Sequence, residues 1–195
     1  NSNFEMINEY RFSTASTVVS GAFSGFYSII YMSNLIVDRV KPDTDIKARV
    51  VGEAKAARAW AMTELISLWG AVPFADHVLG ADEYQLPNGD IPTMWAWVEQ
   101  NRTEAAAVLP AKSGINGQQA IGARLTKEAA LAFLGKAQIF QEKYAEAATS
   151  LKSVINSNKY DLVADFSQLL RSANDFGPEN IFESNAINDP DNAWS

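Results

Sequence analysis

Apolar residues recur along the chain at intervals of three and four, the spacing that places side chains on one face of a helix. This pattern predicts five helices, at about residues 17–38, 48–69, 93–109, 127–141 and 144–156. In addition, a short strand is predicted at residues 181–183, with the sequence Ile-Phe-Glu. The chain is therefore predicted to be all-α, built from helical hairpins joined by long loops.

The first two predicted helices are expected to pack closely. The apolar face of the first consists of Val19, Ala22, Phe23, Phe26 and Ile30. On the same helix, Gly21 and Gly25 would allow a neighbour to approach. The second helix has a stripe formed by Ala54, Ala57, Ala61, Leu65 and Leu68. Further apolar residues widen this stripe, so we expect the second helix to be buried between others and to end at Gly70.

Two stretches without helical periodicity interrupt the pattern. Residues 71–92 contain several prolines and glycines, and residues 111–123 contain three glycines. Loops of this length are usually functional or ordered against a partner surface. Thr93 and Thr126 follow the two loops and are predicted to be the N-caps of the third and fourth helices.

The last two predicted helices match a tetratricopeptide hairpin. Only Glu142 and Lys143 separate them, so the helices must fold back on each other. Gly135 and Ala147 lie at the small-residue positions of that repeat, where the two helix axes can come close. A tetratricopeptide-like hairpin is therefore predicted at about residues 126–156.

The composition excludes several classes of chemistry. Apolar residues make up 47% of the 195 residues, which is enough for a globular core. The net charge of −7 disfavours binding to nucleic acid or to anionic lipid. The chain has no cysteine and one histidine, which removes disulfides, thiolate catalysis, cysteine zinc sites and histidine metal clusters.

No residue pattern indicates catalysis. Glu53 and Glu64 lie three helical turns apart, too far to act together on one bond. Glu53 is instead expected to pair with Lys55 or Arg58. His77 is expected to be a surface or packing residue, because no serine and carboxylate pattern surrounds it.

The sequence also predicts no metal and no cofactor. The acidic turns at residues 43–45 and 189–192 lack the spacing of a calcium-binding loop, and Asp and Asn are common in turns for backbone reasons alone. No glycine-rich motif of the kind that binds nucleotide phosphates occurs in the chain.

The two ends of the sequence lead us to expect a piece of a longer protein. The chain begins at Asn1, without an initiator methionine or an apolar signal segment. It ends in the turn-rich residues 189–195. No apolar run approaches the length of a transmembrane helix.

The second predicted helix carries a motif that resembles the SusD-like (RagB/SusD) family. The motif reads GEAKAARAW at residues 52–60 and continues as ELISLWGAVP at residues 64–73. Other stretches resemble the family in the same order, at residues 26–34, 95–110, 124–147 and 179–183. Together they extend over roughly residues 20–185, so residues 1–195 resemble the N-terminal helical part of a SusD-like domain.

This resemblance implies a function at the cell surface. Members of the family are lipid-anchored outer-membrane proteins of Gram-negative bacteria that bind nutrient oligomers, usually glycans. They lie as a lid over a SusC-like TonB-dependent transporter and have no catalytic activity. The implied ligand is thus an oligosaccharide or a peptide, with no nucleic-acid partner, and the lipid anchor and the C-terminal half lie outside this chain. The packing surface of the hairpins is our candidate for the face that docks on the transporter.

Aromatic residues in loops are the candidates for ligand contact. A ring stacks on the apolar face of a pyranose, while polar neighbours bind its hydroxyl groups. In the family, residues just before the first helix can contribute to glycan contact, and Tyr10, Phe12 and Thr14 occupy that stretch here. Trp194 is added as an aromatic residue in an open loop, and Tyr84 also lies in a loop.

Two other functions remain open at this point. A soluble tetratricopeptide-type adaptor would bind peptides in a concave groove, but its repeats should recur at about 34 residues, and the loop at 71–92 interrupts that period. A glycoside hydrolase would need two carboxylates close together in a cleft. We expect glycan binding and delivery to a transporter rather than either alternative.

Overall fold

The computed structural model describes residues 2–11, 13, 16–112, 124–169, 171 and 174–184. Its helices are α1 (Ser2–Asn8), α2 (Thr17–Arg39), α3 (Asp45–Trp69), α4 (Ile91–Val108), α6 (Lys127–Phe140), α7 (Tyr144–Ile155) and the short 3-10 helix η1 (Phe166–Gln168). Within those ranges the only β-type pairing is an isolated bridge between Pro73 and Asn88. The prediction of an all-α fold is confirmed.

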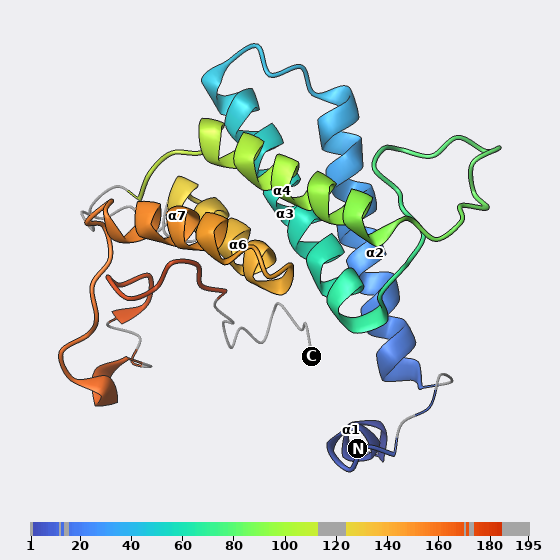
Figure 1. The fold of residues 1–195 in the computed structure, drawn as a ribbon, viewed down its shortest axis with the longest axis horizontal. Coiled ribbons are helices and arrows are strands. Elements are labelled where there is room, and N and C mark those ends of the chain that lie inside the picture. The colour runs from blue at the N-terminus through green and yellow to red at the C-terminus, as the bar shows by residue number, and fades with distance from the viewer. Residues whose placement is uncertain are drawn as a thin grey trace, which may run out of the picture.

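The helices form an array in which each packs on its neighbour in the sequence. As Figure 1 shows, α3 lies between α2 and α4, α4 packs on α6, and α6 packs on α7. This is the arrangement of helical solenoids, in which stacking neighbours bury a continuous core. The loop at residues 71–90 projects beside α2, and the segment that follows α7 lies at the opposite end of the array.

Helix α3 is the centre of the core. Its buried apolar residues are Val51, Ala54, Ala56, Ala59, Ala61, Met62, Leu65 and Ile66. The many alanines allow α2 and α4 to approach on both sides, because a methyl group keeps helix axes close. The expectation of a helix buried between others is confirmed, but Leu68 is 64% exposed, because it lies in the last turn and outside the buried face.

Helix α2 has the predicted length but a partly different buried face. Ile30 is buried and Phe23 packs on the core, whereas Ala22 is exposed. The glycines at 21 and 25 do not serve a close approach, since a Cβ atom at either position would meet nothing within 4 Å. The face that turns to α3 instead includes the polar residues Ser33 and Asn34, which are buried.

The helix ends follow local capping chemistry. Thr126 caps α6, as predicted, by accepting the Ala129 N–H at 3.1 Å, and Gly70 follows α3 with a φ of +74°. Helix α4, however, is capped by Asp90, which accepts the Thr93 N–H at 3.1 Å. The prediction of Thr93 as the cap is therefore wrong, because a proline is tolerated in the first turn of a helix and Pro92 lies there.

The hairpin of α6 and α7 is as tight as its sequence predicted. A Cβ atom at Gly135 would lie 2.7 Å from Leu151 Cγ, so only glycine fits this contact without movement. Ala147 is 2% exposed on the facing helix. Phe140 continues the apolar spacing of α6 but is 53% exposed, because it is the last residue of the helix and lies beyond the tightest part of the hairpin.

The segment after α7 is held by a buried lysine and does not form the predicted strand. Lys112 Nζ donates to the carbonyl oxygens of Gly177 at 2.6 Å and Asn180 at 3.2 Å. Burial lowers the pKa of Lys112, while Glu183 and Glu128 act in the opposite direction. The Glu183 carboxylate accepts the Phe176 N–H at 2.7 Å, so residues 174–184 close into turns instead of extending as a strand.

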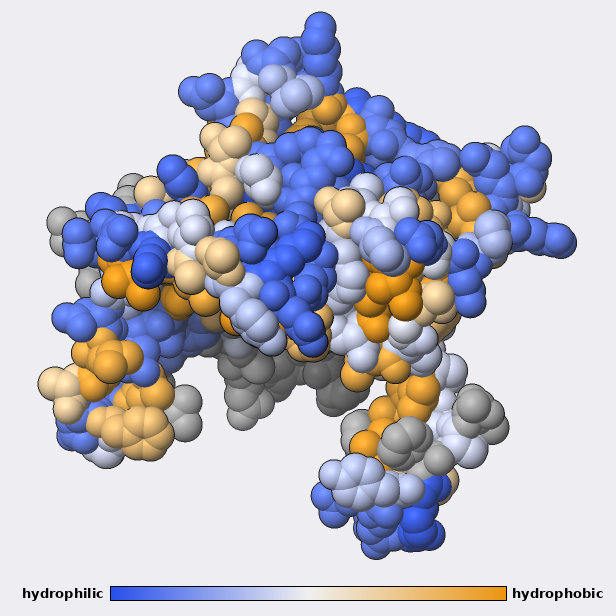
Figure 2. All heavy atoms as spheres, in the orientation of Figure 1, coloured by the Kyte–Doolittle hydropathy of each residue, from blue (hydrophilic) through white to orange (hydrophobic). Residues whose placement is uncertain are grey.

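Most of the surface in this view is hydrophilic, as Figure 2 shows, but apolar patches remain. One lies where α2 meets the segment before it, where a cavity of about 700 Å³ is lined mainly by apolar side chains: Ile7, Val18, Val19, Ala22, Leu68 and Trp69, together with Ser13. On the hairpin, Ile139, Phe140, Tyr144 and Ile155 are each between 46% and 73% exposed. The residues around the cavity form one apolar surface, and contiguous apolar surface marks an interaction site more often than chance exposure does.

Candidate functional site

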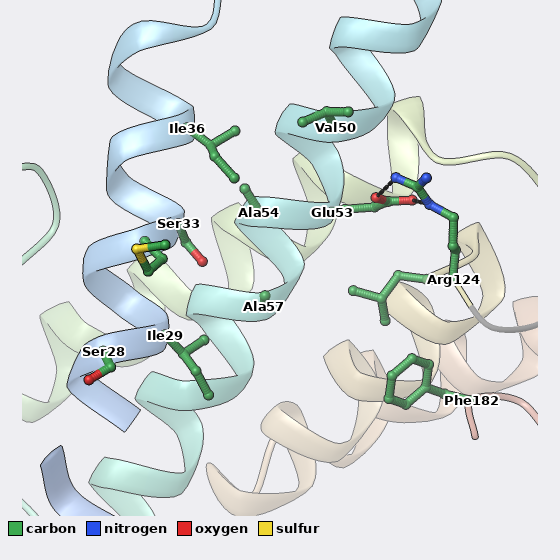
Figure 3. Close-up of a pocket in the computed structure, with 12 residues that line it drawn as sticks. Ser28, Ile29, Ser33, Ile36, Val50, Glu53, Ala54, Ala57, Arg124 and Phe182 are labelled. Carbon is green, nitrogen blue, oxygen red and sulfur yellow. Dashed lines mark hydrogen bonds and ion pairs between the residues drawn. The ribbon is translucent and has the colours of Figure 1, made fainter. Parts of the chain in front are cut away.

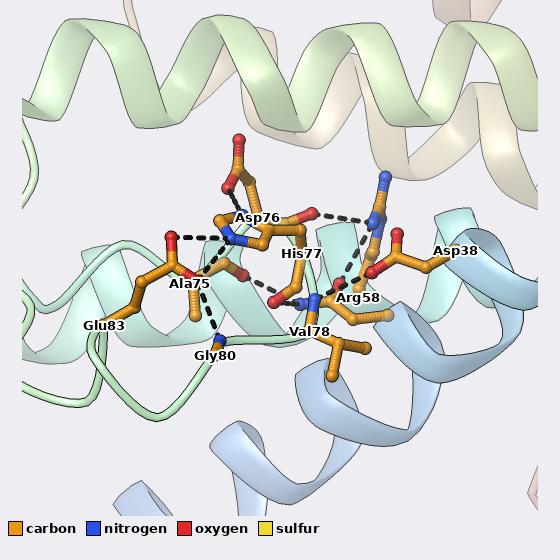
Figure 4. A network of polar contacts seen from close by, with 9 residues as sticks. Asp38, Arg58, Ala75, Asp76, His77, Val78, Gly80 and Glu83 are labelled. Atoms are coloured by element: carbon orange, nitrogen blue, oxygen red, sulfur yellow. Dashed lines mark hydrogen bonds and ion pairs between the residues drawn. The ribbon is translucent and has the colours of Figure 1, made fainter.

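The loop at residues 71–90 is fixed by helix side chains that bind its backbone (Figure 4). Two residues of α2 take part: Tyr27 O–H donates to Pro73 O at 2.6 Å, and Asn34 Nδ2 donates to Ala75 O at 3.1 Å and to His77 O at 2.8 Å. Arg58 of α3 donates from Nη1 to Asp76 O at 3.1 Å. The path of the loop is therefore set by buried groups of the helical core.

Arg58 is the centre of this buried polar cluster. Its Nε donates to Asn101 Oδ1 at 2.8 Å, and its Nη1 donates to Asn34 Oδ1 at 3.0 Å. The guanidinium carbon also lies 4.8 Å from the centre of the Trp97 ring. Burial lowers the pKa of Arg58. Three acidic residues act in the opposite direction, and Asp38 has the largest effect of the three. Because arginine remains charged in proteins, the cluster holds a buried cation whose hydrogen-bond acceptors are neutral oxygens.

The tip of the loop carries the histidine between two carboxylates. His77 Nδ1 lies 2.7 Å from Asp76 Oδ1, and Nε2 lies 3.1 Å from Glu83 Oε1. Glu83 also accepts the Gly80 N–H at 2.7 Å, which closes the tip into a turn. Hydrogen bonds that the His77 ring donates to Asp76 and then to Glu83 raise the pKa of His77, and the hydrogen bond that the Gly80 N–H donates lowers the pKa of Glu83. The side chain of His77 is 47% exposed, in line with the expected surface position.

We predict that the His77 ring titrates above its ordinary pKa of 6.5. A raised histidine pKa contributes stability that is fully present below the unfolded pKa and is lost as the pH rises through the folded one. The lowered pKa of Glu83 adds stability that is lost as the pH falls through its folded value, so the contact is strongest in weak acid. Titration of the ring by NMR measures the shift directly.

The matched controls for this titration lie in the same loop. Asp76→Asn should lower the pKa of His77, because the contact with Asp76 is the main cause of the shift. Asp82→Asn removes a carboxylate that makes no contact with the ring and should leave the value unchanged. Equal pKa values in the wild type and Asp76→Asn would show that this contact does not form.

A groove lies between α2, α3 and the residues that follow the second loop (Figure 3). Its volume is about 720 Å³, and apolar side chains such as Ile29, Ile36 and Phe182 line most of it. Glu53 and Arg124 form an ion pair at one side of it, with Arg124 Nε 2.9 Å from Glu53 Oε1. The groove therefore combines an apolar surface with a single charged edge.

The partners of Glu53 differ from those expected. Its carboxylate binds Arg49 Nε at 3.1 Å and Arg124, and it contacts neither Lys55 nor Arg58. The helix explains the difference, since residues four apart share a face, whereas residues two or five apart do not. The spacing of four residues between Arg49 and Glu53 could have predicted the first ion pair from the sequence. The second pair depends on the fold, because Arg124 is 71 residues from Glu53.

The proposed ligand contacts are only partly visible. Tyr10 is 88% exposed and has a φ of +55°, in the segment between α1 and α2. Phe12, Thr14 and Trp194 lie outside the described residues, so their role stays a prediction. The ring of Tyr10 is therefore exposed on the surface, where a ligand could reach it.

Other functional groups are accounted for by local contacts. At the first acidic turn, Asp43 Oδ1 accepts from Lys47 Nζ at 2.7 Å, and Thr44 caps α3 through the N–H of Lys47 at 3.3 Å. The second turn, at residues 189–192, lies outside the described residues. Nowhere in the described part of the chain do three or more His, Cys, Asp or Glu side chains gather as a metal site. Within the same ranges, no helix is long and apolar enough to cross a membrane.

Residues 1–139 match a protein-family model described as starch-binding and associating with the outer membrane. SusD-like protein P38 from Formosa agariphila is 26% identical over 145 residues, which are 73% of this chain and 27% of that protein. The chain thus spans about a quarter of the length of this relative.

Solved structures share the helical array. Surface glycan-binding protein A from Bacteroides uniformis superposes with a TM-score of 0.82 at 21% identity, over 95% of this chain and 42% of that one. A laminarin-binding SusD-like protein superposes with a TM-score of 0.75 at 26% identity, over 83% of this chain and 36% of that one. The fold of the present chain is therefore that of the corresponding part of these proteins.

Proposed function

Because the chain belongs to the SusD-like family, we propose that the protein binds glycans at the bacterial cell surface and has no catalytic activity. The observation that carries this proposal is the match of residues 1–139 to a family described as starch-binding and associating with the outer membrane. The likeness to a laminarin-binding protein supports an oligosaccharide as the ligand. Glu53 and Glu64 support binding rather than hydrolysis, because each lies in an ion pair with a basic residue.

We further propose that the protein delivers its ligand to a SusC-like TonB-dependent transporter. A lipid anchor outside this chain would hold it at the outer membrane as a lid over the transporter. Ligand that contacts both proteins would favour the closed arrangement by its extra contacts in that state. The hairpin is the proposed docking face, since Tyr144 and Ile155 leave apolar side chains 65% and 73% exposed on α7.

We predict that a large β-barrel protein of the TonB-dependent class is recovered when the full-length protein is pulled down from detergent-solubilised outer membrane. Tyr144→Ser and Ile155→Ser should reduce the recovery of the barrel, because both side chains lie on the proposed docking face. Ile46→Ser is the control, since Ile46 is 77% exposed at the start of α3, away from the hairpin. A protein that came alone from the soluble fraction would favour the tetratricopeptide-type adaptor instead.

Alanine substitutions in the stretch before α2 and at Trp194 test the ligand contacts. The variants are Tyr10→Ala, Phe12→Ala, Thr14→Ala and Trp194→Ala. The one that removes the stacking ring should weaken oligosaccharide binding by about 1–2 kcal/mol without a change in stability. Calorimetric titration with maltoheptaose and with laminarin oligosaccharides measures the effect, and Phe166→Ala, which removes an 84% exposed ring elsewhere, is the control. Equal affinity in all these variants would show that none of the four residues makes the stacking contact.

A further inference from the structure

A smaller pocket lies between α2 and the tip of the loop at residues 71–90. It has a volume of about 270 Å³. Ile30, which is 1% exposed, closes its base, and Tyr31, His77 and Tyr84 lie among the residues around it. Small-molecule pockets start at roughly 300 Å³, so this one has the size for a single ring rather than for a long chain segment.

We propose that this pocket binds one sugar ring of an oligosaccharide, at a site separate from the stretch before α2. The proposal rests on the proposed function, since it takes the ligand to be a glycan, and it adds a contact that the sequence did not predict. Three features of the pocket carry it: exposed aromatic rings, an imidazole among the lining residues, and a loop that is already fixed in place.

The aromatic rings provide the apolar contact. Tyr31 is 54% exposed and Tyr84 is 73% exposed, one on α2 and the other on the loop. In the described part of the chain neither hydroxyl has a hydrogen-bond partner. Each ring therefore offers a face for the C–H groups of a pyranose and a free O–H for its hydroxyls.

The polar ring in the lining beside the tyrosines is His77. Asp76 holds this ring at Nδ1 through Oδ1 and itself lies outside the lining (Figure 4). Glu83 holds the ring at Nε2 and also lies outside the lining. The two carboxylates therefore fix the imidazole in one orientation, in which it can make a polar contact with a sugar ring.

The loop needs little ordering to bind a ligand. Asn34 and Arg58 hold the carbonyl groups of residues 75–77, and Asp38 Oδ2 accepts the Val78 N–H at 2.7 Å. Both Asn34 and Arg58 are themselves buried, which fixes their rotamers by packing. A pocket that is already in its bound form avoids the entropic cost of closing on the ligand.

Tyr31→Ala and Tyr84→Ala test the proposal in the full chain. Each should weaken the binding of maltoheptaose or of laminarin oligosaccharides roughly three- to tenfold in calorimetric titration. Phe166→Ala is the control, because Phe166 is an 84% exposed ring in η1, far along the sequence from the pocket, and its loss should leave the affinity unchanged. In the wild type, adding either oligosaccharide should also shift the NMR signals of the His77 ring.

The outcomes separate this site from the proposed function. Unchanged affinity in both tyrosine variants, or a His77 signal that does not move at saturation, would overturn the pocket while glycan binding by the wild type still stood. Failure of the wild type to bind either oligosaccharide would overturn the pocket and the glycan ligand together. If a tyrosine variant also melts at a lower temperature, the shift of the His77 signal in the wild type decides whether the oligosaccharide binds in the pocket.

Discussion

Replacing Arg58 with methionine should lower the free energy of unfolding by about 3–5 kcal/mol. The variant keeps a long apolar side chain but removes the donors to Asn34, Asn101 and the carbonyl oxygen of Asp76. Buried acceptors that lose their donor carry the full cost of desolvation, about 1–3 kcal/mol each. Chemical denaturation followed by tryptophan fluorescence measures the loss.

Two variants make the Arg58 experiment specific. Lys47→Met removes a cation whose partner Asp43 is exposed, so its expected cost is below about 1 kcal/mol. Arg58→Lys keeps the charge but loses the planar guanidinium group. Its free energy of unfolding should lie between those of the wild type and the methionine variant. A methionine variant as stable as Lys47→Met would show that the buried cluster does not support the fold.

Replacing Gly135 with leucine should lower the free energy of unfolding by about 1–3 kcal/mol, because the side chain overpacks the hairpin. Even a Cβ atom there would lie 2.7 Å from Leu151 Cγ and 3.5 Å from the carbonyl oxygen of Ala147. The helices would have to separate, and Ala147→Leu on the facing helix should act in the same direction. Thermal and denaturant unfolding of both variants measure the effect.

The controls separate crowding from helix propensity. Gly21→Ala and Gly25→Ala in α2 meet nothing within 4 Å and should stabilise the protein by up to about 1 kcal/mol, since alanine favours a helix. Gly135→Ala should fail to give this gain unless Leu151→Ala is added to make room. If Gly135→Ala alone stabilised the protein as Gly25→Ala does, the close contact would be refuted.

The helices and the hairpin were predictable because their determinants are local. Apolar periodicity set the helix spans, and the small residues Gly135 and Ala147 indicated where two helices meet. Two of the errors lie at helix ends: Leu68 and Phe140 continue an apolar stripe by period but fall in the last turn, where more than half of each residue is exposed. Periodicity describes a face of a helix and not the length over which another helix covers it.

The buried polar cluster could not be predicted, because its members come from three helices. Asn34, Arg58 and Asn101 are 24 and 43 residues apart along the chain, and no pattern of residue types fixes which amide will meet which guanidinium. The same holds for Arg124, which reaches Glu53 across 71 residues. The ligand contacts before α2 came from a family resemblance rather than from periodicity, and of them the structure describes Tyr10.

The way in which the loop at residues 71–90 is fastened has a consequence for how this protein can diversify. Tyr27, Asn34 and Arg58 hold the loop by its carbonyl oxygens, and every amino acid provides one. Side chains at the tip of the loop can therefore be exchanged while the path of the backbone is kept. A library that varies residues 81–86 and leaves the three anchors intact should yield folded proteins with altered ligand preference. The residues that fix the path of the loop are thus different from the residues that determine its ligand preference.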